Sequence, residues 1–317
     1  MFIDEVSIVV HSGRGGRGCE SYFRRWDHKR LPNGGDGGDG GNVVLKANQT
    51  VANLYALRSK PVFEAEAGGA GLGNNCYGRK GKDCIVRVPC GTTIYNKHEN
   101  LLIRDLVHTG EEVVILKGGR GGYGNHAGRE PTFGEGAQEL ELLLSFKIIA
   151  DIFLVGLPNS GKTTLLRKLT HARVNETAYP FATKVPQLGT YQSDTGQYCL
   201  CELPSVYGHS EKGRGLGVHF LKHLERARLI FFLLDPEGQF AENMKEGYEM
   251  LLETVAHFNP DFVEIPRFIV INKADLIQKL ASVKKIFPKT EKVYFVSAAE
   301  ETGLKQLMAG AAKRLGV

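Results

Sequence analysis

Eight consecutive residues, Gly156-Leu157-Pro158-Asn159-Ser160-Gly161-Lys162-Thr163, are of the types that bind a chain of phosphates. Glycine at both ends lets backbone N–H groups turn toward phosphate oxygens. Lys162 would reach the β- and γ-phosphates, and the Thr163 hydroxyl would bind Mg²⁺. An apolar run at 148–155 precedes the loop and an amphipathic stretch at 164–169 follows it, as the strand and helix of this motif require. The sequence therefore predicts a nucleotide site with Mg²⁺ as cofactor, against the alternative of a structural turn.

Two later strand ends favour guanine as the base. One apolar run ends in Asn272-Lys273-Ala274-Asp275 and another in Ser297-Ala298-Ala299. The Asp275 carboxylate can accept both N–H groups on the Watson–Crick edge of guanine, which adenine does not offer. Asn272 would buttress the site, the Lys273 stem would cover the base, and a backbone N–H of the Ser-Ala-Ala tripeptide would bind the guanine oxygen, as in GTPases. We therefore predict GTP and GDP as the bound nucleotides, with an ATPase or kinase as the weaker alternative.

The whole chain has the composition of a globular protein. Its 317 residues are enough for roughly two domains, and 42% hydrophobic and 24% charged residues allow real cores. The net charge of +5 permits an anionic partner without requiring one. Six cysteines lack metal-site spacing, and Cys199 and Cys201 lie in an alternating apolar run that favours buried, reduced thiols. Without a leader or an apolar run of 18 residues, we expect a cytoplasmic protein with no membrane partner.

Glycine is concentrated in the first half, with 26 of 39 glycines before residue 137. Many recur every third residue, as in Gly34, Gly37 and Gly40, which is the period of a left-handed extended helix. Strand-like runs lie between the clusters, at 6–10, 42–45, 83–88 and 112–116. These runs favour a folded domain of short β-strands carrying packed glycine-rich extended helices, against the alternative of a disordered glycine linker.

Basic and aromatic residues are interleaved in the same half. The densest patch consists of Arg14, Arg17, Arg24, Arg25, Lys29 and Arg30, with Tyr22, Phe23 and Trp26 among them. This combination suits RNA, because guanidinium groups meet phosphate and rings stack on unpaired bases. A solvated surface with Trp26 in the core is the alternative, which the sequence leaves open.

The domain boundary is expected near 140–147, where the glycine density falls and the run Leu140–Phe146 leads toward the next strand. Strands and helices then alternate, which is typical of a parallel α/β sheet. We therefore predict a glycine-rich domain at 1–147 and an α/β P-loop nucleotide-binding domain at 148–317.

With these motifs in place, the chain resembles the Obg family of GTPases over nearly its full length. The resemblance rests on Met1–Glu5, the glycine clusters, Gly81-Lys82-Asp83, Val88-Pro89 and Gly91-Thr92 in the first half, and on Ala178–Thr183, Gly215-Leu216-Gly217, Phe220-Leu221, His223 and Glu225–Arg228 in the second. It implies an N-terminal Obg fold, a GTPase domain, and a cytoplasmic, monomeric switch that associates with the large ribosomal subunit and its rRNA during assembly. Many family members carry a further C-terminal domain, for which we find no counterpart before Val317.

The resemblance also assigns further site residues. Thr183 matches the switch I threonine, expected to join Thr163 on Mg²⁺ and, with Lys162, to serve catalysis. Its neighbours Phe181, Ala182, Lys184 and Val185 are expected to border the nucleotide. Asn159 matches an asparagine that holds K⁺ in some related GTPases, but we expect it to bond to the backbone of its own loop, with the K⁺ role as the alternative.

One motif departs from the family pattern of Asp-x-Pro-Gly, since this chain has Glu202-Leu203-Pro204-Ser205. Glu202 keeps the charge of the aspartate but adds a methylene beside the metal. Ser205 keeps an N–H for the γ-phosphate but restricts the φ/ψ freedom of a glycine hinge. No glutamine follows to orient water, because Val206 and Tyr207 occupy that place. We therefore expect slow hydrolysis, with a hydrolysis-deficient nucleotide-binding scaffold on the ribosome as the alternative.

Other chemistries find no support in the sequence. The ten histidines show neither an HExxH motif nor metal-ligand spacing, and no Gly-x-Ser-x-Gly elbow is present. The stretches 241–258 and 303–315 are expected to be amphipathic helices facing the core.

Overall fold

The computed structural model describes residues 2–170, 183–193, 196–206, 217–237, 241, 243–277 and 280–316. The chain divides into two compact units, residues 1–147 and 148–317. Each unit has its own sheets and its own core.

The first unit is built from short strands. Its elements are β1 (Glu5–His11), β2 (Tyr22–Arg24), β3 (Arg30–Pro32), β4 (Val43–Ala47), α1 (Tyr55–Ser59), β5 (Val62–Glu64), β6 (Cys84–Val88), β7 (Thr92–Asn96), β8 (Leu101–Leu106), β9 (Glu112–Leu116), the short 3₁₀ helix η1 (His126–Gly128) and β10 (Glu139–Phe146). They form a five-stranded sheet in the order β5-β1-β10-β7-β8, a three-stranded sheet β6-β4-β9 and the hairpin β2-β3. The four strand-like runs lie in β1, β4, β6 and β9, as predicted.

The run 140–146 has a different role from the one expected. It belongs to β10, which pairs antiparallel with both β1 and β7 in the middle of the five-stranded sheet. Its alternate side chains Leu142, Leu144 and Phe146 are buried, so the run is a core strand rather than a lead into the next domain. Sequence alone missed this because the partner strands lie about 130 and 50 residues earlier.

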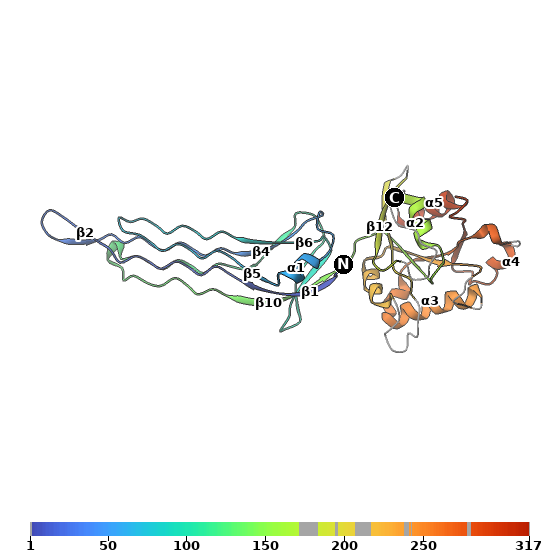
Figure 1. Ribbon diagram of the computed structural model, residues 1–317, viewed down its shortest axis with the longest axis horizontal. Helices are drawn as coiled ribbons and strands as arrows, with labels where there is room; N and C mark the ends of the chain where they lie inside the picture. Colours follow the sequence, from blue (N-terminus) through green and yellow to red (C-terminus); the bar gives the residue numbers. More distant parts are fainter. Residues whose placement is uncertain are drawn as a thin grey trace. The chain divides into compact units, whose positions relative to one another are not determined.

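Long extended segments connect these sheets to the β2-β3 hairpin at the far end of the unit (Figure 1). Their glycines face one another, and neighbouring segments exchange backbone hydrogen bonds at three-residue intervals, such as Gly37 N to Gly122 O and Gly40 N to Gly119 O. A Cβ added at Gly37 would lie 2.0 Å from the Gly16 carbonyl oxygen. The glycine repeat therefore forms a pack of extended helices, as predicted, because only glycine allows this backbone approach.

The second unit is an α/β domain around a six-stranded sheet in the order β12-β13-β11-β14-β15-β16. Its strands are β11 (Ile152–Gly156), β12 (Gln187–Ser193), β13 (Gly196–Glu202), β14 (Leu229–Leu234), β15 (Arg267–Ile271) and β16 (Lys292–Phe295). Its helices are α2 (Lys162–Thr170), η3 (Val218–Arg226), α3 (Met244–Phe258), η4 (Pro260–Glu264), η5 (Ala274–Leu276), α4 (Leu280–Lys284) and α5 (Leu304–Leu315). All neighbouring strands pair in parallel except β12, which is antiparallel to β13.

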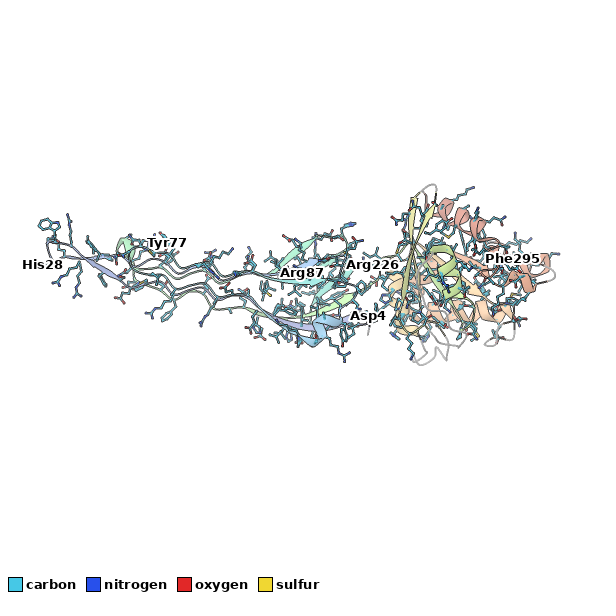
Figure 2. The ribbon with its side chains drawn as sticks, turned by 45° about the horizontal axis from the view of Figure 1, so that its top comes forward. Asp4, His28, Tyr77, Arg87, Arg226 and Phe295 are labelled. Carbon is cyan, nitrogen blue, oxygen red and sulfur yellow. The ribbon has the colours of Figure 1, made fainter. Side chains whose placement is uncertain are left out.

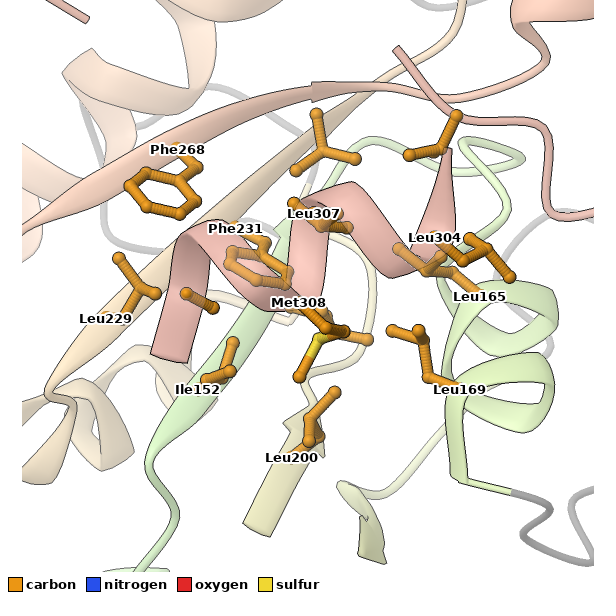
Figure 3. Packing of buried hydrophobic residues seen from close by; sticks show 14 of the residues in the cluster. Ile152, Leu165, Leu169, Leu200, Leu229, Phe231, Phe268, Leu304, Leu307 and Met308 are labelled. Atoms are coloured by element: carbon orange, nitrogen blue, oxygen red, sulfur yellow. The ribbon is translucent and has the colours of Figure 1, made fainter. Parts of the chain in front are cut away.

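Helices cover both faces of this sheet. On one face, α5 packs over Phe231 and Phe268, and residues of α2 such as Leu165 complete the cluster (Figure 3). On the other face, Tyr248 of α3 meets Phe232 edge to face, with ring centroids 6.2 Å apart. The two amphipathic helices predicted from the sequence are α3 and α5. Helix α3 begins at Met244 rather than at 241, because the side chain of Asn243 accepts a hydrogen bond from the Glu246 N–H and caps the helix.

Candidate functional site

The phosphate-binding loop joins the carboxyl end of β11 to the start of α2. Two of its residues have positive φ, Asn159 at 63° and Gly161 at 81°. A Cβ at Gly161 would lie 2.1 Å from Nδ2 of Asn272, so glycine is needed both for the backbone conformation and for this close approach. The Asn159 side chain makes no hydrogen bond within the described part of the chain, so the expected bond to its own loop is not found.

Lys162 lies at the centre of the loop and is buried. Its ammonium nitrogen is 3.0 Å from the Gly156 carbonyl oxygen, 2.9 Å from that of Leu157 and 2.9 Å from the Ser205 hydroxyl. Burial lowers the pKa of Lys162 to about 8, while the negative charge of Glu202 opposes this shift. The carbonyl contacts hold the cation at the mouth of the loop, where a phosphate chain would meet it.

Glu202 ends β13 beside Lys162 and joins two threonines. Its Oε1 accepts hydrogen bonds from the hydroxyls of Thr163, at 2.6 Å, and Thr183, at 3.1 Å. The two hydroxyl oxygens are themselves 3.1 Å apart. Burial raises the pKa of Glu202, and the bond from Thr163, the charge of Lys162 and the bond from Thr183 work against that rise.

This group of oxygens fits a hard divalent cation. The second carboxylate oxygen of Glu202, Oε2, is buried and has no hydrogen-bond partner among the described residues. Buried carboxylate oxygens normally have a partner, so this atom indicates a cation or an ordered water. Hydroxyl and carboxylate oxygens are the ligands that Mg²⁺ prefers. The sequence predicted Thr163 and Thr183 as the metal ligands, and the structure brings them together with Glu202.

The residues predicted to bind the base lie at the neighbouring strand ends. Asn272 is buried after β15, where its Nδ2 donates to the Ser160 carbonyl at 3.0 Å and its Oδ1 accepts from the Ala298 N–H at 3.0 Å. It therefore ties the phosphate loop to the segment Ser297–Ala299, which is the buttress that the sequence suggested. Asp275 lies in η5, is exposed, and makes no hydrogen bond or ion pair within the part of the chain described, so its carboxylate is available to a base.

One residue of this site escaped the sequence reasoning. Asp235 follows β14 and forms an ion pair with the ammonium of Lys273, which itself has the positive φ of 54°. The pair fixes the Lys273 stem over the edge of the sheet where the predicted site lies. A partial signal was available in the sequence, because Asp235 directly follows the apolar run 229–234, and ligand-binding residues of parallel sheets gather at the carboxyl ends of strands. That this strand lies between β11 and β15 is known only from the structure.

The remaining predicted site residues fall into two groups. Phe181 and Ala182, with most of the run 178–183, lie outside the described residues. Lys184 is exposed, Val185 is half-buried, and Leu203 and Pro204 are buried below Ser205. The structure thus places the loop, Thr183, the 202–205 motif and both base elements along one edge of the sheet.

The part of the basic and aromatic patch from Tyr22 to Arg30 forms the β2-β3 hairpin of the first unit, whose turn contains His28 (Figure 2). Arg14 and Arg17 lie before the hairpin, in a glycine-rich extended segment. The turn of the hairpin is closed by the bond from the Arg25 N–H to the Lys29 carbonyl at 3.0 Å. Trp26 is 85% exposed, and Tyr22 and Phe23 are each about half exposed. The alternative with Trp26 in a core is therefore wrong, because the described residues leave most of its side chain uncovered.

Two arginine–aromatic pairs lie elsewhere in the same unit, and one of them is formed by Arg17 of the patch. Arg17 covers the ring of Phe133, with its guanidinium carbon 4.8 Å from the ring centroid, and Arg129 covers Tyr123 at 5.1 Å. Both rings are more than half exposed. Such pairs present a flat cationic surface to solvent.

Other sites are not found in the described ranges. They contain no cluster of three or more His, Cys, Asp or Glu side chains able to hold a metal ion. All six cysteines are free, with Cys201 buried, Cys199 half-buried and Cys76 exposed. No helix in the described ranges is long and apolar enough to span a membrane.

Two family models match the chain. Residues 3–141 match the model described as GTP1/OBG, and residues 151–273 match the model described as 50S ribosome-binding GTPase. Among solved structures, an Era variant from Aquifex aeolicus bound to GDP·AlF4⁻ is similar to 53% of this chain and 57% of its own, with 23% identity and a TM-score of 0.44.

Curated relatives match both units together. The chain is 38% identical to the GTPase Obg of Chlorobaculum tepidum over 96% of this chain and 93% of that protein. It is 36% identical to the GTPase Obg of Persephonella marina over 97% of this chain and 94% of that protein. Together with the glycine-rich unit and the nucleotide site, this similarity shows that the chain belongs to the Obg family of GTPases and is a GTP-binding GTP hydrolase.

Proposed function

We propose that this GTPase acts as a slow switch on the large ribosomal subunit during its assembly, with the first unit docking on rRNA. The observation that carries docking is the β2-β3 hairpin, which exposes Trp26 beside Arg24 and Arg25. The family model that matches residues 151–273 is described as a 50S ribosome-binding GTPase, which supports the same partner.

The nucleotide roles follow from the contacts at the sheet edge. Lys162 would bind the β- and γ-phosphates, and the loop 156–163 would surround them with backbone N–H groups. Asp275 would accept the two N–H groups of guanine, with Lys273 held over the base by Asp235. A backbone N–H of Ser297, Ala298 or Ala299 would bind the guanine oxygen.

Thr163 and Thr183 would hold Mg²⁺, with Glu202 as the nearest carboxylate. The ion would neutralise charge on the β- and γ-phosphates. Glu202 accepts both threonine hydroxyl hydrogens, so the oxygen lone pairs of Thr163 and Thr183 point away from it and would be available to the ion. Thr183 would thereby respond to the γ-phosphate.

Hydrolysis would be slow because little in the site orients water. Val206, directly after the 202–205 motif, is buried and aliphatic, and it offers no group to a water molecule. Tyr207, the next position, lies outside the described residues. The named GTPase relatives favour turnover over a hydrolysis-deficient scaffold.

Docking would use charge and stacking together. Arginines of the hairpin would meet phosphates, and its exposed rings would stack on unpaired bases. The Arg17–Phe133 and Arg129–Tyr123 pairs would extend the same kind of surface along the unit. A cytoplasmic location and a monomeric state remain part of this proposal.

Co-sedimentation with purified large subunits tests the proposal, using a non-hydrolysable GTP analogue, GDP and no nucleotide. We expect binding in the GTP-analogue state that weakens as salt rises. The double variant Arg24→Glu/Arg25→Glu should reduce that binding at least about tenfold, because two phosphate contacts become repulsions. The variant Arg58→Glu/Lys60→Glu makes the same charge change on exposed residues in and just after α1, at the other end of the unit. Equal loss in both variants, or none in either, would contradict docking through the hairpin.

A further inference from the structure

The Ser205 hydroxyl lies against the ammonium of the phosphate-loop lysine. Its Oγ is 2.9 Å from Nζ of Lys162, at the position where the family pattern has a glycine without a side chain. The contact joins the 202–205 motif to the phosphate loop across 43 residues. A serine here therefore adds a polar group at the place where the γ-phosphate must be recognised.

The direction of this hydrogen bond follows from the chemistry of the two groups. A lysine ammonium can only donate, so the Ser205 oxygen accepts. The hydrogen of the hydroxyl then remains for another acceptor. Within the described part of the chain, Ser205 makes no second side-chain hydrogen bond. A donor held against the phosphate-binding cation is suited to an anionic oxygen.

The backbone fixes Ser205 relative to the loop. The Val206 N–H donates to the Gly156 carbonyl at 3.3 Å, and the Leu203 N–H donates to the Leu154 carbonyl at 3.1 Å. On the other side, a Cβ added at Gly217 would lie 2.4 Å from the Ser205 carbonyl oxygen, so the chain is closely packed there. These contacts hold the backbone of Ser205 beside the loop, and the hydrogen bond from Lys162 places its hydroxyl.

We infer that the Ser205 side chain is a ligand of the γ-phosphate and that it discriminates GTP from GDP. Its hydroxyl donates to a γ-phosphate oxygen while its own oxygen accepts from Lys162. The serine thus supplies through its side chain a contact that a glycine supplies only through its backbone N–H. GDP has no oxygen at this position, so its affinity does not depend on the hydroxyl.

A competing arrangement predicts the opposite change in GTP affinity when the hydroxyl is removed. If the hydroxyl occupied the place of a phosphate oxygen on Lys162, it would weaken GTP binding, and its removal would strengthen it. A third arrangement, in which Ser205 only orients Lys162, would alter GTP and GDP affinity together because the lysine also meets the β-phosphate.

The test measures the affinities of the full chain for GDP and for a non-hydrolysable GTP analogue, in Ser205→Ala, Ser205→Gly and Ser205→Thr. We expect about a tenfold loss for the GTP analogue in the alanine and glycine variants, the usual effect of one hydrogen bond to a charged group. GDP affinity should stay within about twofold, and the threonine variant should retain the wild-type ratio because it keeps the hydroxyl.

Ser59→Ala is the matched control, because it removes a serine hydroxyl that bonds to the Ala56 carbonyl in the first unit. Tighter GTP binding in Ser205→Ala, equal losses for GTP and GDP, or no change would each overturn the inference. GDP binding reports that the site is folded, and ribosome binding is not measured. A negative result would therefore leave the docking proposal untouched.

Discussion

The hydroxyl of Thr163 donates a 2.6 Å hydrogen bond to Oε1 of Glu202, which joins the first turn of α2 to the end of β13. The carboxylate of Glu202 contacts this hydroxyl and that of Thr183 directly, at a position where the family pattern has the shorter aspartate. Glu202 therefore orients two of the oxygens that we propose for Mg²⁺.

This relationship predicts how the metal requirement changes in Glu202→Gln. Glutamine keeps the length of the side chain but removes its charge, and its amide nitrogen would face hydroxyl donors or the cation. Since groups that orient metal ligands typically contribute about 10- to 100-fold in metal affinity, the Mg²⁺ concentration for half-maximal GTP binding should rise about tenfold or more. A Mg²⁺ titration with a fluorescent GTP analogue measures this. Glu253→Gln on the exposed face of α3 is the control, and an unchanged midpoint would contradict the role of Glu202.

Asp275→Asn should change the base preference. Asparagine can accept one N–H of guanine, but its NH₂ group then faces the guanine amino group, so GTP affinity should fall at least about a hundredfold. Xanthine has a carbonyl oxygen at that position, to which the new NH₂ group can donate. Competition of GTP, XTP and ATP against a labelled nucleotide measures the preference. A variant that still prefers GTP, or a wild-type protein that prefers ATP, would refute the base-reading role.

Asn272→Ala should loosen the phosphate loop. The substitution leaves the Ser160 carbonyl and the Ala298 N–H without their buried partners, which should destabilise the second unit by about 2–3 kcal/mol. GTP and GDP affinities should fall together, because the loop binds the phosphates of both nucleotides. Denaturant unfolding with and without GDP measures both effects. Asn53→Ala, which removes a bond to the Tyr55 N–H in the first unit, should leave them unchanged.

Gly37→Ala should disrupt the glycine-rich unit. Its methyl group would lie 2.0 Å from the Gly16 carbonyl oxygen, so backbone segments must separate, at more than about 3 kcal/mol. Gly136→Ala is the matched control, because nothing lies within 4 Å of its added Cβ. Limited proteolysis of the full chain should cleave the first unit in Gly37→Ala but not in Gly136→Ala. Both variants should keep the nucleotide affinity of the wild type. Equal protection of both variants would count against the packed arrangement.

Cys199 should become reactive only at high pH. Burial, followed by the negative charge of Asp151, raises the pKa of its thiol to about 11. Because the thiolate is the reacting form, its alkylation rate should rise about tenfold per pH unit between pH 8 and 10. Mass spectrometry after timed iodoacetamide labelling can follow each thiol. Exposed Cys76 should label first, while Cys201, whose pKa burial raises well above its usual value, should label last.

The sequence by itself determined the local elements of this protein. Each of these elements lies within a few consecutive residues, so its backbone conformation and side-chain chemistry can be inferred from the sequence: the loop 156–163, the runs predicted to bind guanine at 272–275 and 297–299, and the three-residue glycine period. The parallel α/β domain followed from the alternation of strands and helices. The departures at Glu202 and Ser205 were equally visible.

Only the tertiary structure decided what those departures touch. The order β13-β11-β14-β15 brings Glu202 and Ser205 beside the phosphate loop and Asp235 beside Lys273, although these residues are far apart in the chain. Likewise, Trp26 is exposed because none of the described residues covers most of its side chain, and the run 140–146 is a central strand because β1 and β7 flank it. Such contacts depend on strand order. The period-2 pattern of a strand says which of its faces is buried, but it does not say which strand lies beside it.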